Sequence, residues 1–219
     1  MCYNENISLN TFIFSIAVMG FIYYNNKYTQ YKTEIFQNKF VYLFFISIVL
    51  MQLIEYFLWK SIKTSNAKMN YIASIIGWIT LRILQPLSFI FLFPSAYTTL
   101  KNPLIILYLI LLAVLTWFRK TPIDFKTTVK NGHLYWNWFN GEKTEYIFLL
   151  IIYFAFSIPA FSMFSSWLKF IILIYLIYLY LNNYENWSSM WCWSINLTFI
   201  YYLFYILIIF PYREYNGLC

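Results

Sequence analysis

The stretch Met51-Gln-Leu-Ile-Glu-Tyr-Phe-Leu-Trp-Lys60 places a glutamine, a glutamate and a tryptophan inside an otherwise apolar run. Gln52, Glu55 and Trp59 are spaced i, i+3 and i+7, so a helix would carry them in one stripe that faces one neighbour. An ionised carboxylate in the middle of a membrane helix costs about 2.5 to 3.5 kcal/mol on insertion scales. The stretch therefore predicts a transmembrane helix in which Glu55 has a partner or a function.

The composition of the whole chain indicates a protein that lies in a lipid bilayer. Of its 219 residues, 62% are hydrophobic and 11% are charged, whereas about a quarter of the residues in a soluble domain are charged. Runs of roughly 17 to 25 apolar residues predict seven spans, at 8–24, 40–59, 71–93, 103–118, 146–161, 167–181 and 190–210. We therefore expect an all-α fold, a single seven-transmembrane-helix bundle that covers residues 1–219.

The net charge of +7 does not indicate nucleic acid binding, because the basic residues are scattered through short loops. Such residues in a multispan protein are typical of topology signals and lipid-headgroup contacts. The chain is also 25% aromatic, more than interfacial belts require. The abundance of Asn, Lys, Ile, Tyr and Phe indicates an AT-rich genome.

Two signals for orientation disagree. The loops on the N-terminal side, after spans two, four and six, hold eight Lys and Arg, and the other side holds six, which slightly favours a cytoplasmic N-terminus. The glycosylation sequons at Asn6 and Asn186 both fall on the N-terminal side and favour a lumenal or extracellular one. We expect the N-terminus outside.

The long polar loop at 119–145, between spans four and five, predicts an extramembrane β-hairpin. Thr127 to Lys130 and His133 to Trp138 flank an Asn131-Gly132 pair that is typical of a type I′ turn. In the second arm Leu134, Trp136 and Trp138 alternate with polar residues, so they share one face. A lone hairpin is marginal in water, and we expect this one to lie on the helix bundle or at the lipid interface. Its position makes it a lid by geometry, and its function as a lid is left open.

Span three carries Arg82 near its middle, on one helical face with Trp78 and Gln85. Pro86 has no N–H, so the carbonyl of Arg82 is left without its helical bond. An arginine at mid-membrane almost always faces the interior of the bundle and pairs with another group. Glu55 is the predicted partner, directly or through one water.

Depth along the helices supports this grouping. Glu55 lies five residues from Lys60, about 7 Å from that surface, and Asn196 lies about 9 Å inside span seven, on one face with Trp193. We predict a polar pocket that opens to the N-terminal side beneath the hairpin. Its candidate residues are Gln52, Glu55, Trp59, Trp78, Arg82, Gln85, His133, Trp193 and Asn196. The alternative is that these polar residues only hold the helices together.

The cysteines leave two alternatives open. Cys2 and Cys192 fall on the same side of the predicted membrane, where they form either a disulfide in an oxidising compartment or two free thiols. One histidine rules out a multi-histidine zinc site, and only a mixed site of Cys2, Cys192, His133 and Glu55 would remain. We expect no metal, and the sequence names no cofactor.

Several scattered motifs resemble an uncharacterised family of small multispan membrane proteins from bacteria, algae and large DNA viruses that begin Met-Cys-Phe. The family carries no established activity, so the resemblance implies only that its shared polar residues belong together. Tyr56 stands where the family has glycine, which would narrow a pocket. The motifs are Met1-Cys2-Tyr3, Gln52-x-x-Glu55 with Trp59, Gln85-Pro86, Gly132-His133-Leu134 with Trp136, and Trp191-Cys192-Trp193.

Three functions fit these features. The first is an integral membrane protein whose polar pocket binds or conducts a small molecule, an ion or a proton, with Glu55 as the titratable group and Arg82 as its counter-ion. The second is a membrane-embedded enzyme that acts on a lipid head group, with Glu55 as acid or base and His133 supplied by the hairpin. The third is a structural component of a membrane or virion that has no ligand.

Overall fold

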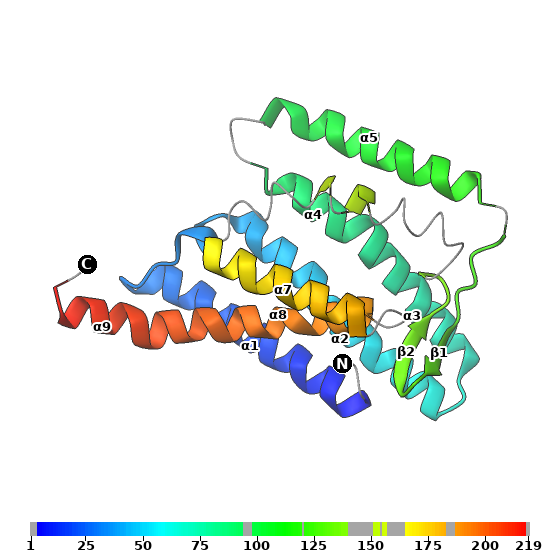
Figure 1. The fold of residues 1–219 in the computed structure, drawn as a ribbon, viewed down its shortest axis with the longest axis horizontal. Helices are drawn as coiled ribbons and strands as arrows, with labels where there is room; N and C mark the ends of the chain where they lie inside the picture. Colours follow the sequence, from blue (N-terminus) through cyan, green and yellow to red (C-terminus); the bar gives the residue numbers. More distant parts are fainter. Residues whose placement is uncertain are drawn as a thin grey trace.

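The computed structural model describes residues 4–93, 98–119, 121–139, 151–153, 155–156, 165–182 and 187–217, and only the backbone of 187–194. Long helices dominate it (Figure 1). The helices are α1 (Glu5–Tyr28), α2 (Lys39–Lys63), α3 (Ala67–Ile79), α4 (Gln85–Phe91), α5 (Thr98–Trp117), α7 (Ser166–Asn182), α8 (Trp187–Phe204) and α9 (Phe210–Tyr215). The other elements are a 3-10 turn (Glu34–Gln37), π turns (Thr80–Leu84 and Tyr205–Ile209) and strands β1 (Thr127–Lys130) and β2 (His133–Trp136).

The helical prediction is confirmed where the structure describes the chain. Six of the seven predicted spans coincide with helices, and five helical stretches are long and apolar enough to cross a membrane. These five are Glu5–Tyr28, Lys39–Lys63, Ala67–Phe91, Thr98–Trp117 and Ile195–Tyr215. The sixth predicted span is the apolar but shorter α7, of 17 residues. The fifth, at 146–161, lies mostly outside the described residues.

Each π turn ends two residues before a proline. The N–H of Gln85 donates to the Thr80 carbonyl five residues back, and Pro86 follows; Phe210 and Pro211 repeat the pattern at the second turn. Because proline donates no hydrogen bond, it would interrupt a regular α-helix at this point. The wider turn lets the helix continue through the interruption.

Helix α2 is the centre of the molecule. It packs against α1, α3, α4 and α8, and β2 touches it as well. Of the residues in its most apolar stretch 61% are buried, compared with 11% in α5. One half of α2 packs through Phe45 onto Ile22 of α1 and Phe199 of α8, and the other half packs through Met51 and Leu58 against the hairpin.

The hairpin forms as predicted and is part of the core. Asn131 and Gly132 have φ values of 52° and 76°, the left-handed pair that a type I′ turn needs. Leu134, Trp136 and Trp138 are each 1% exposed, and the two indole rings stack with centroids 5.0 Å apart. These side chains pack with residues of α2, α3 and α7, so the hairpin lies on the helix bundle as expected, and a role as a lid stays a prediction.

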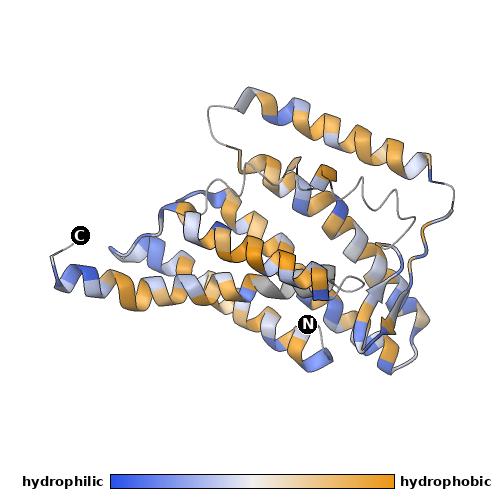
Figure 2. Cartoon of the chain, in the orientation of Figure 1, coloured by the Kyte–Doolittle hydropathy of each residue, from blue (hydrophilic) through white to orange (hydrophobic). Residues whose placement is uncertain are grey.

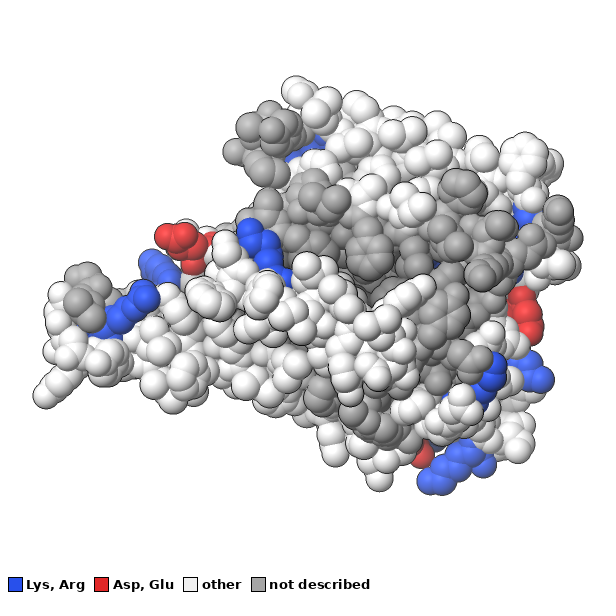
Figure 3. Space-filling model, viewed as in Figure 1, with Lys and Arg blue, Asp and Glu red and all other residues white. Residues whose placement is uncertain are grey.

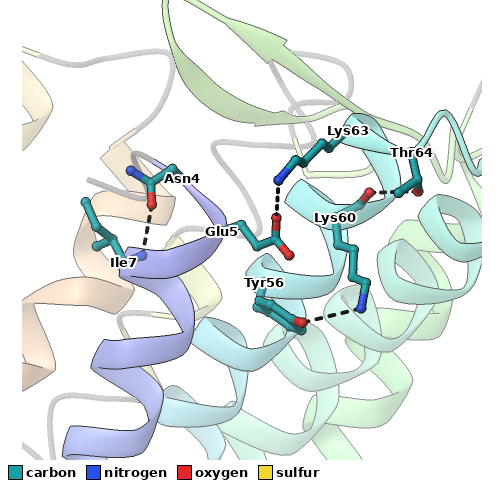
Figure 4. Close-up of polar contacts among 7 residues, drawn as sticks. All are labelled: Asn4, Glu5, Ile7, Tyr56, Lys60, Lys63 and Thr64. Carbon is teal, nitrogen blue, oxygen red and sulfur yellow. Dashed lines mark hydrogen bonds and ion pairs between the residues drawn. The ribbon is translucent and has the colours of Figure 1, made fainter.

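The hairpin end of the molecule also holds the start of α1. The Asn4 side chain caps this helix by accepting from the Ile7 N–H at 2.9 Å, and Lys63 at the end of α2 pairs with Glu5 at 3.4 Å (Figure 4). The helix-to-helix corner that follows Lys63 ends α2 with Ser65 in the left-handed conformation. The N-terminal end of α1, the α2–α3 corner and the hairpin therefore lie together.

The opposite end joins the first loop to the C-terminal helix. The Gln30 side chain donates to Glu214 at 2.6 Å, the Tyr31 hydroxyl donates to the same carboxylate, and the Tyr31 ring stacks on Phe210. The hydropathy of the residues distinguishes the two ends of the molecule from its middle, because apolar residues fill the long middle parts of the helices (Figure 2). On the face in Figure 3 the charged side chains gather toward the two ends.

The contact between Gly77 and Trp138 gives a first prediction. A β-carbon at Gly77 would lie 3.0 Å from the Trp138 ring, whereas one at Gly20 would meet nothing within 4 Å. We expect Gly77→Leu to lower the free energy of unfolding by about 1 to 3 kcal/mol through overpacking. Thermal unfolding in detergent measures this, with Gly20→Leu as the matched control. Equal melting temperatures for the two variants would contradict the packing of the hairpin on α3.

Candidate functional site

The first part of the site is a buried polar contact between the hairpin and α3. The Asn70 side chain donates to the Thr127 carbonyl at 3.0 Å and accepts from the Thr127 N–H at 2.9 Å. The Thr127 hydroxyl lies 2.9 Å from that of Ser74 and accepts from the Trp138 indole at 3.2 Å. Thr127 is 2% exposed. These bonds satisfy the backbone at the start of β1 in a place that water does not reach.

The chain after β2 continues along α3 toward its middle. Trp138 lies against Gly77, and the Arg82 guanidinium lies over the Phe139 ring, 4.8 Å from its centroid. Asn70 and Arg82 are twelve residues apart, which is about 18 Å along a helix. Residues 127–139 therefore follow more than half of the α3–α4 helix rather than only its end.

Three polar side chains predicted for the pocket are fully or almost fully buried. Gln52 and Glu55 are 0% exposed and Arg82 is 5% exposed. Arg82 lies inside the π turn, and its carbonyl accepts from the Tyr108 hydroxyl of α5 at 2.5 Å. This contact confirms that Pro86 leaves the Arg82 carbonyl open to another donor. Such turns occur frequently at functional sites.

The direct Glu55–Arg82 ion pair stays a prediction. The structure places an ion pair between Lys63 and Glu5, 3.4 Å apart, near the ends of α2 and α1. Glu55 and Arg82 are held in the interior on the facing helices α2 and α3–α4, which pack together. The Arg82 guanidinium also lies over the face of the Phe139 ring, and an aromatic face attracts a cation.

Two other predicted residues hold helices together. Gln85 donates to the Ser47 carbonyl of α2 at 3.2 Å and accepts from the Tyr153 hydroxyl at 2.9 Å. Asn196 accepts from the Ser15 hydroxyl of α1 at 2.7 Å. Both side chains are at most 3% exposed. The structure thus places Gln85 and Asn196 in interhelical hydrogen bonds, on different sides of α2.

The two tryptophans of the predicted stripes lie nearer the hairpin end. Trp59 lines a cavity of about 350 Å³ with residues 4–6, Ile62 and Lys63. Trp78 makes an edge contact with Phe125, in the segment before β1. Residues 123–129 and the α2–α3 corner line a second, open cavity of about 760 Å³. These contacts place Trp59 and Trp78 around the hairpin rather than beside Gln85 or Asn196.

His133 lies next to the hairpin turn and is half-buried. It is at the opposite end of β2 from Trp136, about 10 Å away along an extended strand. Burial lowers the pKa of His133 below its ordinary value, which favours the neutral form of the ring. The enzyme hypothesis, which needs His133 beside Glu55, stays a prediction.

The remaining predicted residues are outside the described part or untested. Cys2 and Asn186 lie outside it, as do the side chains of Cys192 and Trp193. Asn6 is exposed in the first turn of α1, and its glycosylation stays a prediction. Within the described residues no group of three His, Cys, Asp or Glu side chains is placed to hold a metal ion.

Sequence reasoning missed the groups that complete these contacts. Thr127, Phe139 and Tyr108 come from distant segments, and nothing in their local sequence distinguishes them from other Thr, Phe and Tyr residues in an aromatic chain. Asn70 could have been found from the sequence. It shares a helical face with Ser74, four residues on, so a buried polar partner for this face was predictable, although the partner residue, Thr127, was not.

The comparisons with known proteins assign the chain to no family. No family model, no curated protein and no solved structure matches the chain. The site is therefore interpreted from its own geometry.

The Asn70–Thr127 contact gives a second prediction. Asn70→Ala removes both bonds to Thr127 and leaves buried backbone groups without partners, so we expect a loss of about 1 to 3 kcal/mol in the free energy of unfolding. Protease cleavage within 121–139 should accelerate. The control is Asn216→Ala, which removes an exposed bond to the Tyr212 carbonyl. An unchanged cleavage rate for Asn70→Ala would show that the hairpin is held by its tryptophans alone.

Proposed function

We propose that the chain is a multi-pass integral membrane protein, and that Glu55 and Arg82 belong to an intramembrane site that binds or conducts a small molecule, an ion or a proton. The observation that carries the proposal is the burial of one acidic and one basic side chain in the middle of apolar helices. Glu55 and Arg82 are 0% and 5% exposed, on stretches long enough to cross a bilayer. Such residues in membrane helices are rare and often mark ligand or ion pathways.

The exposed surfaces of the outer helices support the membrane part. Large apolar side chains point outward along α5, along α7 and along residues 195–209 of the C-terminal helix, and soluble monomers rarely expose continuous apolar surfaces of this kind. Lipid chains would cover them. Examples that are more than half exposed are Ile106, Ile110, Phe170, Leu173, Ile200 and Leu207.

The depths of Glu55 and Arg82 along their helices support a contact between the two charged side chains. Glu55 lies eight residues before the end of α2, about 12 Å, and Arg82 lies fifteen residues after the start of α3, about 22 Å. Side chains lean toward the N-terminus of their own helix. In antiparallel neighbours the Glu55 side chain then leans deeper, while the Arg82 side chain leans back toward the hairpin end. Both directions reduce the difference in depth between the two charged groups.

A structural role for the same residues is the second candidate. It is favoured by Gln85 and Asn196, which the structure places in ordinary interhelical hydrogen bonds. Polar contacts of this kind contribute about 0.6 to 2 kcal/mol each in membrane proteins. A Glu55–Arg82 pair could serve in the same way.

The variant Glu55→Gln separates the two candidates, because it removes the charge and keeps the shape. For a binding site we expect the melting temperature in detergent to stay the same or rise, and its dependence on pH or on added sodium or potassium chloride to disappear. For a structural ion pair we expect a loss of about 3 to 5 kcal/mol, as Arg82 is left with a buried charge.

Controls make this measurement specific. Glu5→Gln removes the carboxylate of an exposed ion pair, which contributes at most about 1 kcal/mol, so its melting curve should follow the wild type. Choline chloride at equal concentration controls for ionic strength. A wild-type protein whose stability is insensitive to pH and to both cations, combined with an unfolded Glu55→Gln, would contradict the proposed site.

A further inference from the structure

A groove on the outside of the α2–α3 pair has apolar walls and a polar mouth. Its volume is about 400 Å³. The walls are apolar, and Phe57, Ile72 and Ile76 are 41% to 46% exposed, so they face outward rather than into the bundle. Asn66 and Lys68 stand at one end. The lining residues are Ile54, Phe57, Asn66, Lys68, Met69, Ile72, Ala73 and Ile76.

The polar end of the groove coincides with the end of the helices. Lys68 is the second residue of α3, and Ile76 lies eight residues further along the same helix, about 12 Å away. If α3 crosses a bilayer, the groove runs from the headgroup level into the hydrocarbon. A cation at the surface and an apolar channel below it match the two parts of an anionic phospholipid.

Neighbouring lysines are engaged elsewhere, which leaves Lys68 for the headgroup. Lys63 pairs with Glu5, and the Lys60 ammonium lies 3.5 Å from the Tyr56 hydroxyl and over the Tyr56 ring (Figure 4). Lys68 is exposed and makes no ion pair with a described residue. Because Lys68 lines the groove, its charge is available at the groove mouth.

We infer that this groove binds an anionic phospholipid, with one acyl chain between Phe57 and Ile76 and the phosphate on Lys68. The inference rests on the proposed membrane insertion. It is independent of the proposed role of Glu55, although Ile54, the residue before Glu55, forms part of the groove wall. A bound lipid would thus stabilise α2 against α3 on the outer side of the buried charges.

The test is native mass spectrometry of the full chain in detergent, titrated with phosphatidylglycerol or with phosphatidylcholine of the same acyl chains. One lysine near a lipid surface contributes about fivefold in affinity. We expect phosphatidylglycerol to bind about fivefold more tightly, and Lys68→Gln to remove this preference. Lys32→Gln, at the opposite end of the molecule, should leave it unchanged.

A second variant tests the acyl chain. Ile76→Trp should fill the groove and weaken both lipids, whereas Ile106→Trp on the exposed face of α5 should weaken neither. Equal binding of the two lipids, or a preference that survives Lys68→Gln, would overturn the inference. Extraction of membranes at alkaline pH is measured in parallel. A protein that stays in the membrane but shows no preference refutes the lipid site alone, and one that is extracted refutes membrane insertion as well.

Discussion

A carboxylate in the middle of an apolar membrane helix can be kept only if the face of the helix that carries it points into the protein. This constraint explains the arrangement around α2. It is flanked by α1 and α8 on one part of its length and by α3, α4 and the hairpin on the other, and Glu55 and Gln52 are 0% exposed. The outer helices α5 and α7 are covered on one side and expose apolar residues on the other. The molecule therefore surrounds a polar centre with an apolar surface, as a lipid environment requires.

The hairpin is part of the protein that surrounds α2, and the hydrogen bonds of its backbone explain how strands can lie there. Strands and irregular segments are tolerated at depth only where protein satisfies their polar groups. Asn70 supplies both bonds that Thr127 needs, and the Trp138 indole donates to the hydroxyl of Thr127. Beyond β2, Phe139 presents its ring to Arg82. The same segment thus closes the core and contributes to the surroundings of the buried arginine.

The sequence predicted elements that depend on local patterns and missed contacts that depend on folding. Apolar run length predicted six helices in the described residues, and the Asn131-Gly132 pair predicted the turn. Pro86 predicted the open carbonyl of Arg82, but Tyr108, its donor, is on another helix. The polar stripe was predicted as one site, whereas Gln85 bonds to Ser47 of α2 and Asn196 bonds to Ser15 of α1. Helical spacing fixes which residues share a face, and it does not say which neighbour that face meets.

Cysteine labelling in sealed membrane vesicles tests the central claim most directly. In a chain whose three cysteines, Cys2, Cys192 and Cys219, are replaced by serine, single cysteines are placed at Lys130 in the hairpin and at Lys32 in the loop after α1. The account predicts that a membrane-impermeant maleimide labels one position in intact vesicles and the other only after detergent, because the two ends of the helices lie on opposite sides of the bilayer. Labelling of both positions in intact vesicles would contradict it.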